Sequence, residues 1–336
     1  MNLVYGLVLG LWWVLHLCYG DEFWWLAVVN AFSLYLFFPL GPALIITLIA
    51  RKRLLWLINL PFLVLFGWLY GELFLPRLPT KPAQDAPVVT VMSFNVLYSN
   101  GHGEALADVI AAQKADIVAL HELTPEIADT LVDRLGEDYP YQIILARRGS
   151  AGLGVMSRYP LRDEGIVALQ PWGEAAAHGM LVEVDGWLLR LLNVHAMPVP
   201  FSSITETIEY ITWSFRKREA QIETLMRYLE GRHEPVIVVG DFNVTDQNAA
   251  YSYLTKHLTD AYRAAGWGFG HTFPAPPRRL WSLPVMFLPL RIDYIFHSPD
   301  MVALSAHVGP PDGSDHQPVV ARLAFRAIKE SISLTK

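Results

Sequence analysis

Six short segments place residues that can bind metals or transfer protons directly after apolar runs of the chain. These segments are Ser93-Phe94-Asn95, His121-Glu122-Leu123-Thr124, Asn193-Val194-His195, Gly240-Asp241-Phe242-Asn243, Arg291-Ile292-Asp293-Tyr294 and Ser314-Asp315-His316. Each alone is weak evidence, because a single Glu or His after a buried strand is more often a cap or a packed side chain. Together they indicate one site, since loops at strand ends gather side chains into a common cleft.

The residue types of these segments favour a hard metal ion. Carboxylates and amides offer oxygen ligands, which Mg²⁺ and Mn²⁺ prefer, whereas a structural zinc site would need thiolates. The chain has one cysteine, Cys18, and it lies in an apolar run far upstream of these segments. We therefore expect Mg²⁺ (or Mn²⁺) as cofactor.

The elements that must position these residues follow from the pattern after residue 88, where apolar runs alternate with helical periodicity. We expect helices over Glu104–Lys114 and Thr205–Leu229, the second stopped by Gly231, and a hairpin at Asp185-Gly186. The expected strands are Val88–Val96, Asp116–Leu120, Tyr141–Ala146, Gly154–Ser157, Met180–Val184, Trp187–Val194, Val236–Val239, Arg291–Phe296 and Val319–Phe325. Many strands with few, widely spaced helices favour an α+β fold in which two sheets pack face to face with helices outside.

The order, spacing and strand context of the six segments resemble the endonuclease/exonuclease/phosphatase superfamily. This superfamily includes DNase I, apurinic endonucleases, inositol polyphosphate 5-phosphatases and neutral sphingomyelinases. The resemblance runs from about Val88 to Phe325 and includes the stretch Gly154-Val155-Met156-Ser157-Arg158-Tyr159-Pro160. It implies a DNase I-like four-layer α/β/β/α sandwich, preceded here by an N-terminal transmembrane helical region, and metal-dependent hydrolysis of phosphoesters.

The resemblance also implies a set of metal-binding residues. Glu122 is expected to be the principal ligand, with Asn95 beside it binding the metal or a phosphate oxygen. Asp315 is expected to support the metal or a nearby water. Many nucleases of the family carry an acidic residue two positions after the strand Asn, where this chain has Leu97. That departure argues against a second metal and disfavours the apurinic-endonuclease type.

Five further residues are expected to act on the substrate, again by resemblance. Asp241 and Asn243 would orient the attacking water and hold a phosphoryl oxygen. His316 would pair with Asp293, whose carboxylate fixes the tautomer of the imidazole. His195 would donate a hydrogen bond to a phosphoryl oxygen as charge develops there. Either Asp241 or His316 could take the proton from water.

The first 76 residues are far more apolar than the rest and raise the mean hydropathy of the chain to +0.29. Three runs, residues 3–19, 23–50 and 54–76, are each long enough to cross a hydrocarbon core of about 30 Å. The second run contains Pro39 and Pro42, so we interpret it as one tilted or kinked crossing, with a re-entrant break as the lesser alternative. A cleaved signal peptide is disfavoured, because no basic segment follows Met1 and two more apolar runs follow the first.

These patterns divide the chain into a transmembrane region of about three helices (residues 1–76), a linker (residues 77–87) and a catalytic domain (residues 88–336). The basic cluster Arg51-Lys52-Arg53 separates the second and third runs and should remain cytoplasmic. Three crossings then place the catalytic domain outside the cytoplasm. We expect an integral protein of the plasma or inner membrane with an extracytoplasmic catalytic domain.

Charge and local composition bear on the substrate. Residues 82–336 carry 21 Lys and Arg residues against 29 Asp and Glu residues, a formal charge of −8. This balance disfavours a general nucleic-acid surface, which neutralises phosphates with Lys and Arg. The apolar insertion at residues 276–290 favours contact with membrane lipids, with packing on the protein itself as an equal alternative. The basic turn Arg216-Lys217-Arg218 is more simply a solvated helix face.

These observations predict a membrane-anchored, Mg²⁺-dependent phosphodiesterase whose substrate is a lipid-linked or head-group phosphoester. An extracytoplasmic nuclease acting on DNA or RNA is the first alternative. A catalytically silent membrane scaffold with the same fold is the second. Because such scaffolds usually lose a key catalytic group and this chain keeps all of them, the enzyme is the favoured interpretation.

Overall fold

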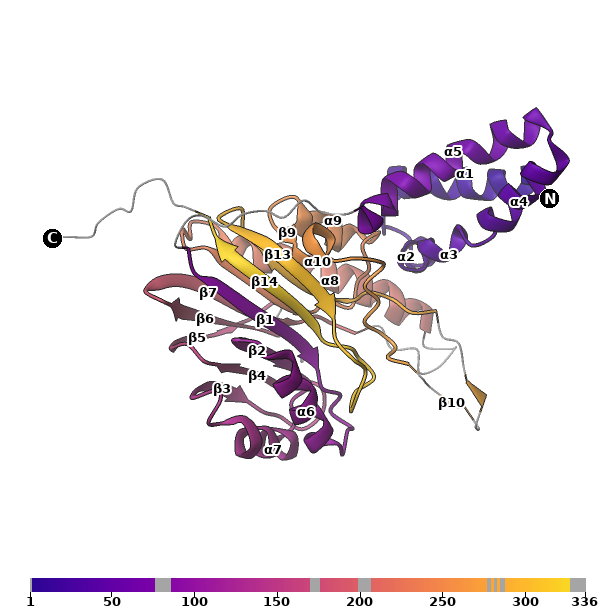
Figure 1. Ribbon diagram of the computed structural model, residues 1–336. Helices are drawn as coiled ribbons and strands as arrows, with labels where there is room; N and C mark the ends of the chain where they lie inside the picture. Colours follow the sequence, from indigo (N-terminus) through magenta and orange to yellow (C-terminus); the bar gives the residue numbers. More distant parts are fainter. Residues whose placement is uncertain are drawn as a thin grey trace.

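The computed structural model describes residues 2–75, 86–169, 176–198, 207–276, 279–280, 283–284 and 288–326. A bundle of N-terminal helices projects from one end of a domain built on two β-sheets (Figure 1). Of the expected linker, only residues 86 and 87 belong to the described part.

Each of the two large sheets has six strands. The first has the order β13-β14-β1-β2-β4-β3, formed by Met301–Val308, Val319–Phe325, Val88–Asn95, Ile117–His121, Leu153–Ser157 and Tyr141–Leu145. The second has the order β5-β6-β7-β8-β12-β9, formed by Leu161–Val167, Ala176–Val184, Trp187–His195, Val236–Asp241, Asp293–His297 and Thr259–Asp260. Two short strands pair separately, β10 (Arg279–Leu280) and β11 (Leu283–Pro284).

The helices of this domain are α6 (Gly103–Gln113), α7 (Pro125–Leu135), α8 (Thr207–Leu229), α9 (Ala249–Thr255) and α10 (Ala261–Ala265). The sheets face each other across an apolar core that both of them supply. Helices α6 and α7 cover the outer face of the first sheet, and α8 and α9 cover the outer face of the second. The four-layer α/β/β/α sandwich expected from the sequence is confirmed.

Burial on both faces explains why the strands that carry the site read as continuous apolar runs. Strand β8 is buried at all six positions, because one face meets the first sheet and the other meets α8 and α9. A strand that is covered on both sides has no solvent face to make polar. Its polar residue, Asp241, therefore comes at its last position, where the strand ends.

The N-terminal region consists of α1 (Asn2–Tyr19), α2 (Trp24–Ala31), α3 (Ser33–Leu36), α4 (Leu40–Ala50), α5 (Arg53–Tyr70) and the 3₁₀ helix η1 (Gly71–Phe74). Three stretches of the described chain are long and apolar enough to cross a membrane, namely Asn2–Tyr19, Ser33–Ala50 and Arg53–Phe74. The second run of the sequence, residues 23–50, is thus divided. Its first part, α2, is too short to cross a bilayer and packs against α8.

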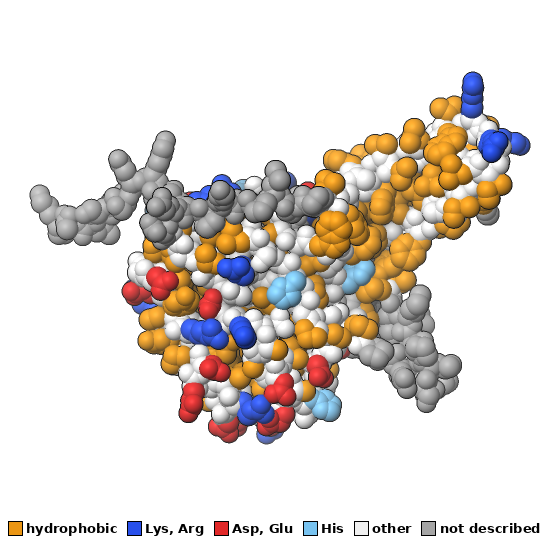
Figure 2. Space-filling view, viewed as in Figure 1, with side chains coloured by type: hydrophobic (Ala, Val, Ile, Leu, Met, Phe, Trp, Pro, Cys, Tyr) orange, Lys and Arg blue, Asp and Glu red, His pale blue; other side chains and the backbone are white. Residues whose placement is uncertain are grey.

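The surface of the bundle is largely hydrophobic along its length (Figure 2). Leu7, Ile49, Leu57 and Val64 each expose more than half of their surface. Soluble proteins rarely present so extended an apolar surface to water. The junction of α4 and α5, residues 51–53, forms the tip of the bundle farthest from the sheets and holds the Lys and Arg residues of this region.

Buried polar contacts attach the bundle to the catalytic domain. Asp21, in the turn between α1 and α2, accepts hydrogen bonds from Asn30 Nδ2 (2.8 Å), Asn248 Nδ2 (3.1 Å) and the N–H of Ala249 (2.7 Å). Asn248 Nδ2 also donates to the carbonyl oxygen of Ala27 (3.2 Å). Because these groups are withdrawn from water, they fix α2 against the start of α9.

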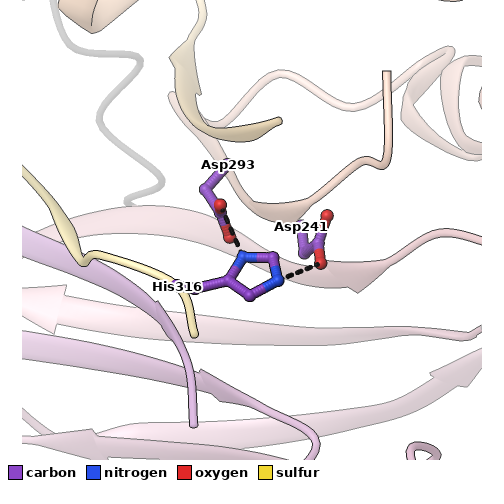
Figure 3. A group of neighbouring side chains, drawn as sticks. All are labelled: Asp241, Asp293 and His316. Carbon is purple, nitrogen blue, oxygen red and sulfur yellow. Dashed lines mark hydrogen bonds and ion pairs between the residues drawn. The ribbon is translucent and has the colours of Figure 1, made fainter. Parts of the chain in front are cut away.

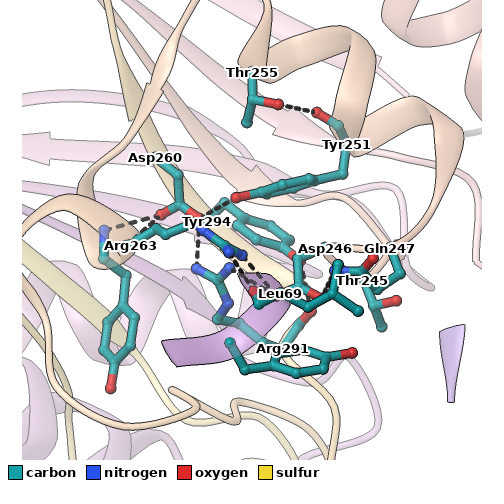
Figure 4. A network of polar contacts seen from close by, with 12 residues as sticks. Leu69, Thr245, Asp246, Gln247, Tyr251, Thr255, Asp260, Arg263, Arg291 and Tyr294 are labelled. Carbon is teal, nitrogen blue, oxygen red and sulfur yellow. Dashed lines mark hydrogen bonds and ion pairs between the residues drawn. The ribbon is translucent and has the colours of Figure 1, made fainter. Parts of the chain in front are cut away.

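A second polar network joins the end of α5 to the catalytic domain (Figure 4). Arg263 of α10 donates from Nη2 to the carbonyl oxygen of Leu69 (2.5 Å) and from Nη1 to Asp246 (3.2 Å). Arg291, which is 5% exposed, donates from Nη1 to Asp260 (2.6 Å) and lies beside the same Asp246. Arg263 also forms an ion pair with Glu72 of η1, so a charged group of the bundle is paired with one of the catalytic domain.

Candidate active site

Strand register brings three of the predicted residues into one row across the second sheet. His195 lies opposite Asp241 in the parallel pair β7–β8, and Asp241 lies opposite Asp293 in the antiparallel pair β8–β12. The close approach of β7 requires a glycine before Asp241, because a side chain at Gly240 would collide with the carbonyl oxygen of Val194. Side chains from three neighbouring strands thus meet at one place.

Two more predicted residues enter from the first sheet. Asn95 is the last residue of β1, and Glu122 directly follows the residue of β2 that lies opposite Asn95. Asn193 of β7 bridges the sheets, because its Nδ2 donates to the carbonyl oxygens of Leu120 (3.2 Å) and Gly154 (3.0 Å). This bridge holds the strand ends of both sheets at a fixed separation.

His316 and Asp293 form a buried hydrogen-bonded pair (Figure 3). His316 Nδ1–H donates to Asp293 Oδ2 over 2.9 Å, and His316 Nε2 lies 3.8 Å from Asp241 Oδ2. Burial by itself lowers the pKa of His316, but the carboxylates of Asp293 and Asp241 outweigh it and raise this pKa to about 10. Burial and then repulsion from Asp293 raise the pKa of Asp241 to about 6. The protonation states of the imidazole and of the two carboxylates therefore depend on one another.

The ring of His195 is held by a hydrogen bond from Nδ1 to a backbone carbonyl, and its Nε2 points at Glu122 and Asp241. Its Nδ1–H donates to the carbonyl oxygen of Ser150 over 3.1 Å, which fixes the ring. Its Nε2 lies 3.8 Å from Glu122 Oε1 and 3.9 Å from Asp241 Oδ2, and it is buried with no hydrogen-bond partner in the described structure. Since an unpaired buried nitrogen is unfavourable, it is available to an oxygen of a bound molecule.

The side chain of Asn95 lies between two carboxylates. Its Nδ2 donates to Glu122 Oε1 and to Asp241 Oδ2, both over 3.1 Å. Its Oδ1 accepts from the N–H of Leu97 over 3.0 Å, so the amide nitrogen faces the cluster. Of the two roles expected for Asn95, this orientation suits a donor to a phosphate oxygen better than a metal ligand. The N–H of Tyr98 bonds the other oxygen of Glu122 over 3.1 Å.

Three residues of the site have left-handed backbone conformations, which residues other than glycine rarely adopt. They are Leu97 (φ 60°), Glu122 (φ 59°) and Asn243 (φ 53°). Each such conformation costs about 1–3 kcal/mol and is kept only where the surroundings impose it. At Asn243 the result is that its N–H donates to Asp241 Oδ1 (2.9 Å) while its Nδ2 donates to the carbonyl oxygen of Ala196 (3.1 Å).

A cavity of about 240 Å³ opens onto this cluster. Five of the residues predicted from the sequence line it: Glu122, Asp241, Asn243, Asp315 and His316. The other three contact these, Asn95 through Glu122 and Asp241, His195 through the same two carboxylates, and Asp293 through His316. All eight residues predicted for the site therefore gather in one place.

Two hydroxyl groups for which no role was predicted hold the strand ends around the cluster. Ser314 Oγ–H donates to the carbonyl oxygen of Asn95 (2.7 Å), and Oγ accepts from the N–H of His316 (3.1 Å). Thr272 Oγ1 lies 3.3 Å from the N–H of Asp293 and accepts from it. The available signals were the Ser before Asp315 and the Thr that follows His271, and both are too common to single out alone.

The donor set fits a divalent cation. Glu122, Asp241 and Asp315 line the cavity, and no Lys or Arg lines it among the described residues. A phosphate group is anionic and needs added positive charge to enter such a site. Ligand atoms of Asp241, Asp293 and His316 also lie within 4.8 Å of one another. The carboxylates of Glu122 and Asp315 line the same cavity beside this group, and carboxylate oxygens are ligands that divalent cations prefer.

A two-sheet sandwich that presents carboxylates, amides and a His–Asp pair at the common end of its strands defines a hydrolase of phosphoester bonds. The model of the endonuclease/exonuclease/phosphatase family matches residues 92–316, from within β1 to His316. The chain belongs to this family.

Solved structures share the fold at low sequence identity. An endonuclease/exonuclease/phosphatase from Bacteroides vulgatus is 21% identical with a TM-score of 0.57, over 71% of this chain and 100% of that chain. Truncated Caenorhabditis elegans TDP2 is 18% identical with a TM-score of 0.55, over 71% and 98%. D. rerio TDP2, solved with a single-strand DNA product, is 18% identical with a TM-score of 0.56, over 70% and 98%. A search of curated proteins finds no match.

Proposed function

We propose that this protein is a membrane-anchored, Mg²⁺-dependent phosphodiesterase that cleaves lipid-linked or head-group phosphoesters. The observation that carries the proposal is the position of the acidic cluster. Glu122, Asp241 and His316 line a cavity without Lys or Arg among the described residues, in a domain that is docked to an apolar helical bundle. The family of phosphoester hydrolases supports the reaction, and the three helices of membrane-spanning length support a position beside lipids.

In the proposed reaction, water attacks phosphorus in line with the leaving oxygen. A P–O bond to the water forms, and the P–O bond to the leaving group breaks. The pair of Asp241 and His316, 3.8 Å apart, receives the proton of the water and returns it to the leaving oxygen. His195 Nε2, which carries a proton in the imidazolium form of the ring, and Asn95 Nδ2 donate to the phosphoryl oxygens as negative charge grows on them.

Glu122 and Asp315 are the residues proposed to hold the divalent cation, with Asn95 beside them. The cation, when bound, would supply positive charge to the phosphoryl oxygens and to the attacking water. The other tasks belong to the chain itself. Asn243 fixes the rotamer of Asp241 through its N–H, and Asp293 fixes the ring of His316.

The proposed orientation places the catalytic domain outside the cytoplasm. Residues 51–53 are exposed at the tip of the bundle, and the sheets lie at its other end. Because Lys and Arg near the end of a transmembrane helix favour the cytoplasmic side, the opposite end faces the other compartment. Protease added to intact cells or spheroplasts should cut the catalytic domain. Complete protection of that domain, with an extracytoplasmic marker digested in the same sample, would show that the orientation is reversed.

The choice of lipid over nucleic acid rests on charge. The D. rerio TDP2 structure contains a single-strand DNA product, so a nuclease is the alternative that a structural neighbour supports. Nucleases that hold single strands line their grooves with Lys, Arg and stacking aromatics. Residues 82–336 of this chain have a formal charge of −8, which favours a substrate that is held by other means.

The proposal is tested with the full-length protein in detergent. The substrates are sphingomyelin, glycerophospholipids, inositol phosphates, single- and double-stranded DNA, and a chromogenic phosphodiester, each with Mg²⁺, with Mn²⁺ and with EDTA. We expect lipid turnover that EDTA abolishes and that Mg²⁺ restores. Turnover of DNA alone would favour the nuclease, and no cation-dependent turnover on any substrate would favour the silent scaffold.

A further inference from the structure

The wall of the active-site cavity is partly made by the N-terminal helices. Val28 and Ala31 of α2, and Phe32 directly after it, line the same cavity as Asp241 and His316. The two sets of residues are more than 200 positions apart in the sequence, and the docking of α2 on the catalytic domain brings them together. The bundle therefore contributes to the active site as well as to membrane attachment.

Apolar side chains from the catalytic domain extend this wall. Phe215 of α8 lines the cavity, as do Phe273 and Leu290, whose backbones pair with each other, and Ile292 just before β12. One cavity thus combines carboxylates and an imidazole with hydrocarbon and aromatic groups. We call the second set, Val28, Ala31, Phe32, Phe215, Phe273, Leu290 and Ile292, the apolar wall.

The position of α2 in this wall is fixed by buried contacts. Ala27 is fully buried against Ile211 and Phe215 of α8. The carbonyl oxygen of Ala27 also accepts a hydrogen bond from Asn248, which in turn bonds Asp21. A helix held by both apolar packing and buried hydrogen bonds keeps its side chains in place, so the wall is a built surface of the cavity.

We infer that the apolar wall binds the hydrocarbon chain of a lipid phosphoester whose phosphate lies against the acidic cluster. This inference rests on the proposed function. It gives a binding site to the hydrocarbon chain of the substrate, which the catalytic residues do not contact. An apolar pocket with a few convergent polar groups matches a ligand that has both an apolar and a polar part. Burial of each methylene group against such a wall is favourable.

The wall is continuous with the part of the chain that faces the bilayer. Phe32 is followed directly by Ser33–Ala50, which is one of the three stretches of membrane-spanning length. Phe38 and Ile45 in that stretch are largely exposed, as side chains in contact with lipid are. A lipid chain can therefore reach the wall along this stretch from the bilayer. A nucleic-acid strand would meet hydrophobic side chains there, with no Lys or Arg among the described lining residues.

The test uses two chromogenic diesters that differ only in their chain, 4-nitrophenyl hexadecyl phosphate and 4-nitrophenyl methyl phosphate. Both are assayed with the full-length protein in the same detergent and Mg²⁺. We expect wild type to hydrolyse the hexadecyl ester with a kcat/KM at least about tenfold higher, because several methylenes are buried. Ala31→Trp fills the wall and should lower that ratio at least about tenfold. Phe32→Ala removes part of the wall and should lower the ratio less.

Ala50→Trp is the matched control, because Ala50 is exposed in the same region at the other end of α4. It should keep the wild-type ratio. Residual hydrolysis of the methyl ester by Ala31→Trp shows that the variant is folded. If wild type hydrolyses both esters but Ala31→Trp keeps the wild-type ratio, the wall does not bind the chain. If wild type hydrolyses neither ester, the proposed function fails, and the inference fails with it.

Discussion

Two buried polar clusters of this protein differ in how completely their atoms are paired. We call the first the docking cluster; it consists of Asp21, Asn30, Asn248 and Ala249. Its Asp21 carboxylate receives three hydrogen bonds, two of them from the catalytic domain. In the catalytic cluster, His195 Nε2 and Asp293 Oδ1 are buried without a hydrogen-bond partner among the described residues. An unpaired buried polar atom costs about 1–3 kcal/mol. The first cluster therefore stabilises the structure, whereas the second is arranged for a ligand.

Neutralising Asp241 should have the largest effect, because it should lower activity strongly without lowering stability. In Asp241→Asn the side chain cannot accept a proton, so we expect kcat to fall by about 10²–10⁴-fold, the usual contribution of general acid–base catalysis. Burial raises the pKa of Asp241 to about 6, so its charge is unfavourable in the folded protein at neutral pH. The free energy of unfolding should therefore stay equal or rise. Denaturant titration and steady-state kinetics measure the two effects.

Asp129→Asn is the control for that substitution, because Asp129 is exposed on α7, away from the cluster. It should change neither kcat nor stability. A variant Asp241→Asn that loses stability along with activity would show that the catalytic cluster also holds the fold together, and the contrast between the two clusters would disappear.

Removing the Asp21 carboxylate should instead lower the free energy of unfolding. Asp21→Ala removes one acceptor each from Asn30 Nδ2, Asn248 Nδ2 and the N–H of Ala249. At about 1 kcal/mol for each buried donor, we expect a loss of about 3 kcal/mol in the free energy of unfolding. Glu22→Ala is the matched control, since Glu22 is the exposed next residue. Equal stability of the two variants would show that the docking contacts contribute nothing.

Glu122 should affect cation binding more than stability. Glu122→Gln removes a charge that the acidic cavity is proposed to use for the cation, so half-maximal activity should need about 10–100-fold more Mg²⁺. Titration of activity with Mg²⁺ measures the effect, and Glu137→Gln, at an exposed position of the same sheet's outer layer, is the control. An unchanged Mg²⁺ dependence would place the cation on other residues.

Much of the catalytic domain could be predicted because its strands are covered on both faces. Strands β1, β2 and β8 are largely apolar, and each ends at or directly before a polar residue of the site. Strand β5 was not predicted, because it is largely exposed and its apolar residues are interrupted by Arg162-Asp163-Glu164-Gly165. Helix α7 was also missed, although Thr124 caps it by accepting from the N–H of Ile127 and Pro125 opens it, which is a recognisable start signal.

The apolar wall could not be predicted from the sequence. Val28 and Phe32 lie in a long apolar run that reads as part of one membrane crossing, and hydrophobicity alone does not show where such a run breaks. The break depends on Asp21 and Asn248, which are more than 200 residues apart and meet only in the folded protein. Contacts of this kind leave no periodic signal in either segment.

The smallest expected effect concerns a histidine on the docking side. His271 lies near Tyr70 and Leu73 of the bundle, and its ring stacks on Phe269. Burial, and then the nearby charge of Arg291, lower the pKa of His271 to about 4. His271 is therefore neutral in the folded protein at pH values where it is protonated in the unfolded chain. The corresponding stability is complete above about pH 6.5 and is lost as the pH falls towards 4.

Between pH 7.5 and pH 5.5 this residue should lower the free energy of unfolding of the wild type by about 1 kcal/mol. Over the lower pH unit of this range the histidine is protonated in the unfolded chain and neutral in the folded protein. His271→Gln cannot be protonated, so its stability should fall less over the same range. Unfolding titrations at the two pH values measure the difference, with exposed His233→Gln as the control. If His271→Gln loses as much stability as wild type, the histidine does not couple pH to docking, and the acid sensitivity of this interface lies in its carboxylates.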